Sequence, residues 1–264
     1  MLTPLVDDED LKIYQGNCLG ILREMEDNSA DAAVTSPPYL DARPEYDSPS
    51  LDEFLLIFTE LRRVVSGPML LNVGRLWRNK IESLWWVDLL SRASAAGWEL
   101  RDTLCWIKKN ANPLRGEVLA DSHEYVFLLG DNFNTDEIRT PYAAESIARM
   151  SRKWKNSGAV KGQHKEQESR ELNPLGARPR SFIATNTGKE KGNPHPAPMA
   201  LDLAKHLVQL ATPAGGTIID CFAGSGTTAV AARAHGRKSI LIELSYEYAA
   251  LAALRLAQQA LTIW

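Results

Sequence analysis

The sequence lacks the features that mark several common protein classes. Its 264 residues include three cysteines, Cys18, Cys105 and Cys221, too few and too far apart for a disulfide framework or a zinc site. No apolar run approaches the ~18 residues of a membrane span, and the acidic start at 1–10 is unlike a secretory signal. No HxxxH pair and no GxxxxGK[ST] motif occur. These absences disfavour a metalloprotease and a P-loop protein, and we expect no metal site and a cytoplasmic location.

Positive charge is concentrated in one segment of an acidic protein. Residues 149–191 carry 11 Lys/Arg and four Asp/Glu, a net charge of +7, whereas the rest of the chain sums to −10. A basic block of this kind indicates a polyanionic partner, with nucleic acid as the first candidate, although a solvated loop would have the same composition. The segment is rich in Gly, Asn, Pro and Ser and has no hydrophobic period, so we interpret it as an insertion.

Outside this block, short apolar runs alternate with segments of helical periodicity. The predicted strands are 11–14, 31–35, 69–73, 100–107, 124–129, 217–221 and 239–244. The predicted helices are 18–25, 51–65, 81–96, 199–210, 227–235 and 246–261. Because helices separate most of the strands, the pattern predicts an α/β fold with a seven-stranded, mostly parallel sheet and helices on both faces.

A glycine-rich turn follows one of these strands, in the segment Asp-Cys-Phe-Ala-Gly-Ser-Gly-Thr-Thr at 220–228. Gly224 and Gly226 allow the backbone to approach a ligand closely, and the helix that follows adds backbone donors. The next strand ends at Glu243, whose carboxylate suits a ribose diol. The turn leaves three interpretations open: a dinucleotide site, an S-adenosylmethionine site, or a tight turn with a structural role alone. The acid Asp220 favours the cationic S-adenosylmethionine over a pyrophosphate.

A second turn, Thr-Ser-Pro-Pro-Tyr, ends the strand at 31–35. Pro37 and Pro38 have fixed φ angles, so the carbonyls of Ser36 and Pro37 have little local freedom. These rigid acceptors and the Ser36 hydroxyl lie beside the ring of Tyr39, an arrangement that suits a planar heterocycle with an exocyclic amine. Taken alone, the turn would also fit a proline-stiffened loop with a packing tyrosine.

Together, the two turns resemble those of the amino-methyltransferases of DNA, which methylate exocyclic amines with S-adenosylmethionine. The Ser-Pro-Pro-Tyr motif precedes the glycine turn and the basic block lies between them, as in the β group of that family. The segments 13–18, 123–127 and 195–198 are also similar to family segments, and the resemblance covers 11–130 and 193–260.

The resemblance implies a Rossmann-like methyltransferase fold in three parts. Residues 1–130 form the catalytic half, 131–192 a basic target-recognition insertion, and 193–264 the cofactor-binding half of the same domain. It implies catalytic roles for Ser36, Pro37, Pro38 and Tyr39. It implies cofactor contacts for Asn17, Cys18, Thr35, Asp220, Phe222, Ala223, Gly224, Ser225, Gly226, Thr227 and Glu243. We expect DNA contacts from Arg43, Arg152, Lys153, Lys155, Arg178 and Arg180.

One of these positions departs from the family pattern. Asn17 stands where the family commonly has aspartate, so an amide replaces the expected carboxylate. Its carbonyl can still accept a hydrogen bond from the adenine of the cofactor, and we retain it as a contact.

The implied reaction is methyl transfer to a base amine in double-stranded DNA. The Ser36 hydroxyl and the Pro37 carbonyl accept hydrogen bonds from the amine, and these bonds strengthen as the nitrogen becomes positive. Tyr39 stacks on the base, which must leave the duplex. Serine at the first motif position resembles the cytosine-N4 branch, with adenine-N6 as the alternative. Carbon-5 methylation is disfavoured because no cysteine follows a proline, and we interpret Cys18 and Cys221 as packing residues.

The biological setting implied is a prokaryotic or phage protein that protects DNA. A restriction endonuclease that acts on the same site is a candidate partner, no membrane partner is expected, and the chain is a monomer or a homodimer. A catalytically silent DNA-binding protein and a dinucleotide-dependent oxidoreductase are the competing hypotheses.

Overall fold

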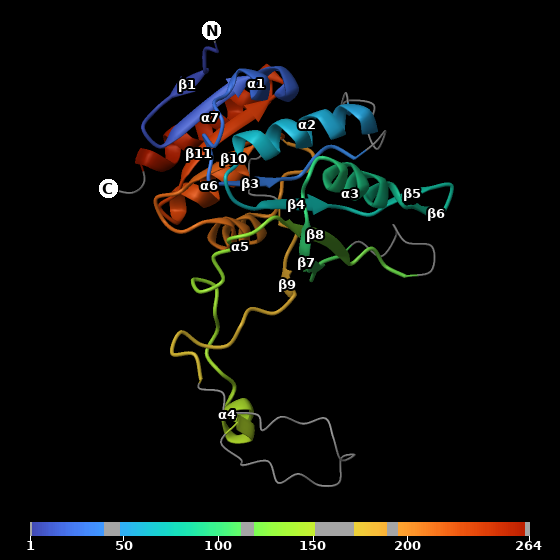
Figure 1. Cartoon of the computed structure of the whole chain (residues 1–264), viewed down its shortest axis with the longest axis vertical. Helices are drawn as coiled ribbons and strands as arrows, with labels where there is room; N and C mark the ends of the chain where they lie inside the picture. Colours follow the sequence, from blue (N-terminus) through green and yellow to red (C-terminus); the bar gives the residue numbers. More distant parts are fainter. Residues whose placement is uncertain (1, 40–47, 112–118, 151–171, 189–194, 262–264) are drawn as a thin grey trace. The chain divides into compact units, whose positions relative to one another are not determined.

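The computed structural model describes residues 2–39, 48–111, 119–150, 172–188 and 195–261 (Figure 1). The chain divides into two compact units. The larger unit comprises residues 1–134 and 180–264, and the smaller one residues 135–179. In the described part of the chain, no helix combines the length and the apolar character needed to cross a bilayer.

The larger unit is built on a sheet of nine strands, counted over the described residues, in the order β1-β2-β11-β10-β3-β4-β8-β7-β9. From edge to edge the strands are β1 (Val6–Asp7), β2 (Leu11–Gln15), β11 (Lys238–Glu243), β10 (Thr217–Asp220), β3 (Ala32–Thr35), β4 (Met69–Val73), β8 (His123–Leu129), β7 (Leu100–Lys108) and β9 (Phe182–Thr185). The five strands from β2 to β4 are mutually parallel. Strand β8 is antiparallel to both β4 and β7, β1 is antiparallel to β2, and β9 is parallel to β7.

Helices cover both faces of this sheet (Figure 1). On one face lie α1 (Cys18–Glu24), α2 (Leu51–Val64) and α3 (Trp85–Ala95), and on the other α5 (Leu201–Ala211), α6 (Thr227–Ala234) and α7 (Tyr246–Leu261). Side chains alternate between the faces of a strand, so adjacent residues enter different cores. Tyr14 packs in the cluster beneath α1–α3, whereas Ile13 packs in the cluster beneath α6 and α7. The central strands are buried on both faces, which explains their continuous apolar runs.

The predicted Rossmann-like α/β fold is confirmed, with a larger sheet than expected. All seven predicted strands are present, and β1 and β9 extend the sheet at its two edges. Strand β1 has only two residues and β9 only four, too short for an alternating pattern to be visible in the sequence.

The helix predicted at 81–96 begins later than expected. It starts at Trp85, because residues 81–83 form β6 (Ile81–Ser83), which pairs with β5 (Leu76–Arg78) in a separate hairpin. Both residues of the connecting turn, Asn79 and Lys80, have positive φ angles, the geometry of a tight two-residue hairpin turn.

Within its described residues, 135–150 and 172–179, the smaller unit contains one short helix, α4 (Ala144–Met150), and a bridge between Thr140 and Ala177. It is shorter than the insertion expected at 131–192. Residues 182–185 lie in strand β9 of the main sheet, so the carboxyl-terminal part of that segment belongs to the larger unit.

Candidate active site

Four neighbouring parallel strands bring the two predicted turns together at the carboxyl ends of these strands. The Ser-Pro-Pro-Tyr turn follows β3, the glycine turn follows β10, Glu243 ends β11, and Asn17 follows β2. Parallel strands end at the same edge, where α/β proteins commonly bind ligands. The structure therefore collects residues from both ends of the sequence at this edge.

A buried hydrogen bond joins the two turns directly. The Thr35 hydroxyl donates to Asp220 Oδ1 at 2.7 Å, the Thr228 hydroxyl donates to Oδ2 at 2.6 Å, and the Phe222 amide donates to Oδ1 at 3.1 Å. Asp220 is 3% exposed, and burial raises the pKa of its carboxyl group to about 6, against the lowering effect of these hydrogen bonds. Asp220 therefore holds the turns together, and a direct contact with the cofactor stays a prediction.

The glycine turn has the backbone geometry that its sequence predicts. Gly224 and Gly226 have φ angles of +51° and +78°, in the left-handed region. A Cβ on Gly226 would lie 2.8 Å from the Cβ of Ala252, and one on Gly224 would lie 2.8 Å from Nε2 of His195. Both positions thus require glycine for conformation and for space.

Glu243 lies next to this turn and is bound to it. Its Oε2 accepts from the Gly224 amide at 2.7 Å, and its Oε1 accepts from the Ser245 amide at 2.9 Å. Burial raises the pKa of its carboxyl group. Each carboxylate oxygen has a second lone pair, so the group can also accept from the two hydroxyls of a ribose. A carboxylate that can accept from a ribose, beside a glycine turn, fits the ribose of an S-adenosyl cofactor.

Asn17 has a structural role that the sequence analysis missed. It is the N-cap residue of α1, and its side-chain oxygen accepts from the amides of Leu19 and Gly20 at 3.0 and 3.3 Å. An asparagine directly before an apolar helical segment is a recognised capping signal. Its contact with adenine stays a prediction.

The two cysteines near the site are packing residues, as predicted. Cys18 and Cys221 lie in the same hydrophobic core cluster. Burial raises the pKa of Cys18 to about 12 and that of Cys221 well above its ordinary value, so neither thiol is a ready nucleophile. Of the other predicted cofactor residues, Phe222 is half-buried and Ala223, Ser225 and Thr227 are buried.

The Ser-Pro-Pro-Tyr turn contacts polar residues that the sequence analysis did not identify. The Asn72 amide in β4 donates to Ser36 Oγ at 3.3 Å and to Glu124 Oε2 in β8 at 3.0 Å. Glu124 Oε1 lies 2.8 Å from the Lys108 ammonium in β7. A single polar residue inside an otherwise apolar strand, as in Met-Leu-Leu-Asn-Val at 69–73, was the signal available for Asn72.

Tyr39 is held at the far end of the turn. Its ring packs against Trp85 with centroids 5.1 Å apart, and its hydroxyl contacts Glu124 and the Gly74 amide. Burial of this hydroxyl and the nearby Glu124 carboxylate raise the pKa of Tyr39 well above its ordinary value. A Cβ on Gly74 would overlap the Tyr39 hydroxyl, so the observed position of the Tyr39 ring requires glycine there. Tyr39 as a whole residue is half-buried, and stacking of its ring on a base stays a prediction.

Most of the predicted DNA contacts cannot be placed. Arg43, Arg152, Lys153 and Lys155 lie outside the described residues. Arg178, in the smaller unit, and Arg180, in the larger one, are exposed. The Arg180 guanidinium lies 5.6 Å from the ring centre of Phe182, the first residue of β9.

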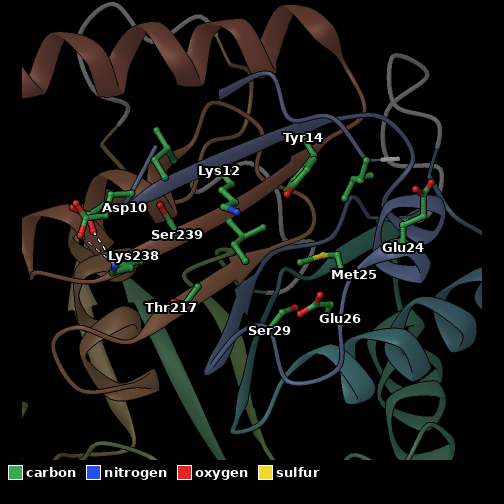
Figure 2. A pocket seen from close by; sticks show the side chains of 14 residues that line it. Asp10, Lys12, Tyr14, Glu24, Met25, Glu26, Ser29, Thr217, Lys238 and Ser239 are labelled. Carbon is green, nitrogen blue, oxygen red and sulfur yellow. Dashed lines mark ion pairs between the residues drawn. The ribbon is translucent and has the colours of Figure 1, made fainter. Parts of the chain in front are cut away.

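A cavity of about 440 Å³ lies near the amino-terminal ends of β10 and β11, away from the two turns. Its lining includes Thr217 and Lys238, the first residues of β10 and β11. Figure 2 shows Lys238 paired with Asp10 at this cavity, and the two charges lie 3.6 Å apart. None of the predicted catalytic or cofactor residues lines it, so it is separate from the candidate active site.

Comparison with known protein families identifies the family to which the chain belongs. The model of the family described as "DNA methylase" matches residues 30–254. The chain belongs to the DNA methylase family. The chain is therefore a DNA methyltransferase of the N4/N6 family. This membership confirms the resemblance predicted from the two turns. S-adenosylmethionine is the cofactor, in agreement with a solved structure of similar fold, titled as a putative DNA modification methylase from Thermus thermophilus complexed with S-adenosyl-L-methionine.

Individual relatives within the DNA methylases agree with this assignment. The chain is 31% identical to the type II methyltransferase M.SfiI of Streptomyces fimbriatus over 75% of its length, and it spans 54% of that relative. It is 26% identical to M1.MboII of Moraxella bovis, over 90% of this chain and 93% of that one. The solved structure titled PvuII DNA methyltransferase (cytosine-N4-specific) has the same fold, with a TM-score of 0.72 and 18% identity over 96% of this chain and 89% of that one.

Proposed function

We propose that this DNA methyltransferase transfers a methyl group from S-adenosylmethionine to the 4-amino group of a cytosine flipped out of duplex DNA. The observation that supports the proposal is the Thr35–Asp220 hydrogen bond, which joins the Ser-Pro-Pro-Tyr turn to the glycine turn. Serine at the first position of the Ser-Pro-Pro-Tyr motif favours cytosine, and the 6-amino group of adenine is the alternative target.

The cofactor supplies an electrophilic methyl group, so the protein's main task is to hold the two reactants in line. The cofactor is held by the glycine turn, by Glu243 at its ribose and by Asn17 at its adenine. Asp220 holds the two turns together through its hydrogen bonds to Thr35, Phe222 and Thr228, and its buried negative charge favours a cationic ligand.

The remaining task concerns the amine, whose lone pair is delocalised into the ring of the base. The Ser36 hydroxyl and the Pro37 carbonyl accept its N–H bonds and increase the electron density on nitrogen. These hydrogen bonds strengthen as the nitrogen becomes positive, so they stabilise the transition state more than the bound substrate. Tyr39 contacts the ring of the base beside them.

The partner is double-stranded DNA, bound through the basic residues of the 149–191 segment and Arg43. The relatives M.SfiI and M1.MboII are named type II methyltransferases, which supports a role in restriction–modification with an endonuclease that recognises the same sequence. The chain acts as a monomer or a homodimer.

The test is identification of the methylated nucleoside. The protein is incubated with S-adenosylmethionine and genomic DNA from a host without DNA methylation, and the digested product is analysed by mass spectrometry. N4-methylcytosine supports the proposal. N6-methyladenine keeps the mechanism and overturns the choice of base. Absence of both nucleosides contradicts the proposed function.

A further inference from the structure

A line of polar side chains crosses four neighbouring strands and ends at the Ser-Pro-Pro-Tyr turn. It runs from Lys108 in β7 to Glu124 in β8, to Asn72 in β4, and then to Ser36 after β3. The three distances along it are 2.8, 3.0 and 3.3 Å. Lys108, Glu124 and Asn72 are buried or nearly so, which is unusual for such groups unless they are paired.

The direction of each hydrogen bond in this line follows from Glu124. An ionised carboxylate only accepts hydrogen bonds, so Asn72 must present its NH₂ group to Glu124. The same NH₂ group then faces Ser36 and donates to its Oγ. Glu124 thereby determines that Ser36 receives a hydrogen bond from Asn72.

Asn72 does not contribute to stability as a fully satisfied core residue would. Its Oδ1 is buried and has no hydrogen-bond partner within the part of the chain that the structure describes. An unpaired buried carbonyl is unfavourable, and such groups concentrate where function requires them. Asn72 itself is 3% exposed and lies in a strand whose other residues are all apolar.

Glu124 also reaches the last residue of the turn. The Tyr39 hydroxyl donates a hydrogen bond to the Glu124 carboxylate. The Tyr39 ring is supported by Trp85, whose indole nitrogen donates to the Gly74 carbonyl at 3.1 Å. The Glu124 carboxylate is thus linked to both ends of the turn at 36–39. It contacts Tyr39 directly, and it is linked to Ser36 through the Asn72 side chain.

We propose that Glu124 positions both ends of the catalytic turn and that Asn72 is the positioning residue through which it orients the Ser36 hydroxyl. The hydrogen bond from Asn72 occupies one lone pair of Ser36 Oγ. The second lone pair is left for the target amine, and the hydroxyl proton is left for the ring nitrogen next to that amine, which is N3 in cytosine. The ion pair with Lys108 holds the other oxygen of the Glu124 carboxylate. This inference rests on the proposed function.

The test is a double-mutant cycle on methyl transfer. Asn72→Ala, Ser36→Ala and the double variant are compared with the wild type at saturating S-adenosylmethionine. We expect Asn72→Ala to lower kcat about 10-fold or more and to have no further effect in the Ser36→Ala background, because coupled residues are not additive. The dissociation constant of S-adenosylhomocysteine, measured by calorimetry, stays unchanged and shows that the variants are folded.

Asn134→Ala is the matched control. It removes another asparagine amide, which donates to the Gln209 carbonyl at 3.0 Å away from the strand ends, and it keeps the wild-type kcat. If the double variant loses kcat by the product of the two single-variant factors, or if Asn72→Ala keeps the wild-type kcat, the inference is overturned while the proposed function stands. A wild-type protein that methylates no DNA would instead overturn the proposed function, and the inference with it.

A second measurement reads the geometry without activity. The side-chain NH₂ signal of Asn72 is assigned in ¹H–¹⁵N spectra by its absence from the Asn72→Ala variant. We expect it to shift in both Ser36→Ala and Glu124→Gln, because both partners of that group are changed. A signal that moves in neither variant contradicts the proposed line of contacts.

Discussion

The Thr35 hydroxyl donates to the Asp220 carboxylate at 2.7 Å, although the two residues are 185 positions apart in the sequence. Thr35 ends β3 and Asp220 ends β10, and these strands are neighbours in the sheet. The contact fixes the Ser-Pro-Pro-Tyr turn against the glycine turn within one sheet. The segment between the two motifs can therefore vary in length and structure without changing the distance between the two turns.

Replacement of Thr35 by valine removes this contact with little change in shape. We expect Thr35→Val to lower the free energy of unfolding by about 1–3 kcal/mol, because the buried carboxylate loses one of its donors. Urea denaturation at pH 7 measures the change. Thr59→Val is the control, since the exposed Thr59 hydroxyl donates only within α2, to the Leu55 carbonyl. Equal effects of the two substitutions would argue against a special role for Thr35.

The buried acid predicts a pH dependence of stability. Burial raises the pKa of Asp220 in the folded protein to about 6, so the folded state holds a proton that the unfolded state releases at lower pH. The free energy of unfolding therefore falls as pH rises from about 4 to 6, by roughly 3 kcal/mol for a shift of about two units. Asp220→Asn removes this contribution. We expect the wild type to lose stability relative to the variant across this range, and parallel pH profiles from denaturant titrations would contradict the assignment.

The sequence predicts the site's two turns well because both depend on local backbone chemistry. Pro37 and Pro38 restrict the first turn, and Gly224 and Gly226 permit the second, so the residue types alone indicate the geometry. The polar line through Lys108, Glu124 and Asn72 is different. It depends on the order of strands β4, β8 and β7 in the sheet, which no local pattern encodes.

The edges of the fold were missed for a related reason. Strand β9 lies within a basic, irregular segment and is a strand only because it pairs with β7, with Phe182 opposite Cys105. The hairpin of β5 and β6 was hidden because Ile81 continues the apolar spacing of α3 toward its amino-terminal side. In both cases tertiary pairing determines the structure more than the local propensity does.

Removal of the Ser36 hydroxyl tests the catalytic turn. We expect Ser36→Ala to lower kcat about 100-fold, because a hydrogen bond that strengthens in the transition state is lost. The dissociation constant of S-adenosylhomocysteine remains at the wild-type value, since the hydrogen bond to the glycine turn is made by Thr35, whereas the Ser36 hydroxyl accepts from Asn72. Steady-state methylation and calorimetry provide the two readouts. A collapse of cofactor affinity would make Ser36 a cofactor-binding or folding residue instead.

A substitution at Gly74 tests whether the position of the Tyr39 ring matters for activity. A Cβ at this position overlaps the Tyr39 hydroxyl, so Gly74→Ala forces the ring away from Trp85 and Glu124. We expect methyl transfer to fall at least 10-fold while S-adenosylhomocysteine still binds. Gly20→Ala is the matched control, because a Cβ there meets nothing within 4 Å and the residue lies inside α1, where alanine favours the helix by up to about 1 kcal/mol. Equal methyl-transfer activity in the two variants would show that the position of the Tyr39 ring does not affect methyl transfer.

The boundaries of the smaller unit determine how the recognition segment should be removed. The Ala177 amide donates to the Thr140 carbonyl at 2.8 Å, so a short glycine–serine linker can join these residues in place of 141–176. We expect this variant to bind S-adenosylhomocysteine normally and to lose methyl transfer to DNA, together with most of the salt dependence of DNA binding, because seven of the eleven Lys/Arg residues of the 149–191 segment are gone. A longer deletion that extends to residue 190 also removes β9 and should destabilise the main sheet at β7. Sequence-specific methylation by the shorter deletion would place DNA recognition outside this segment.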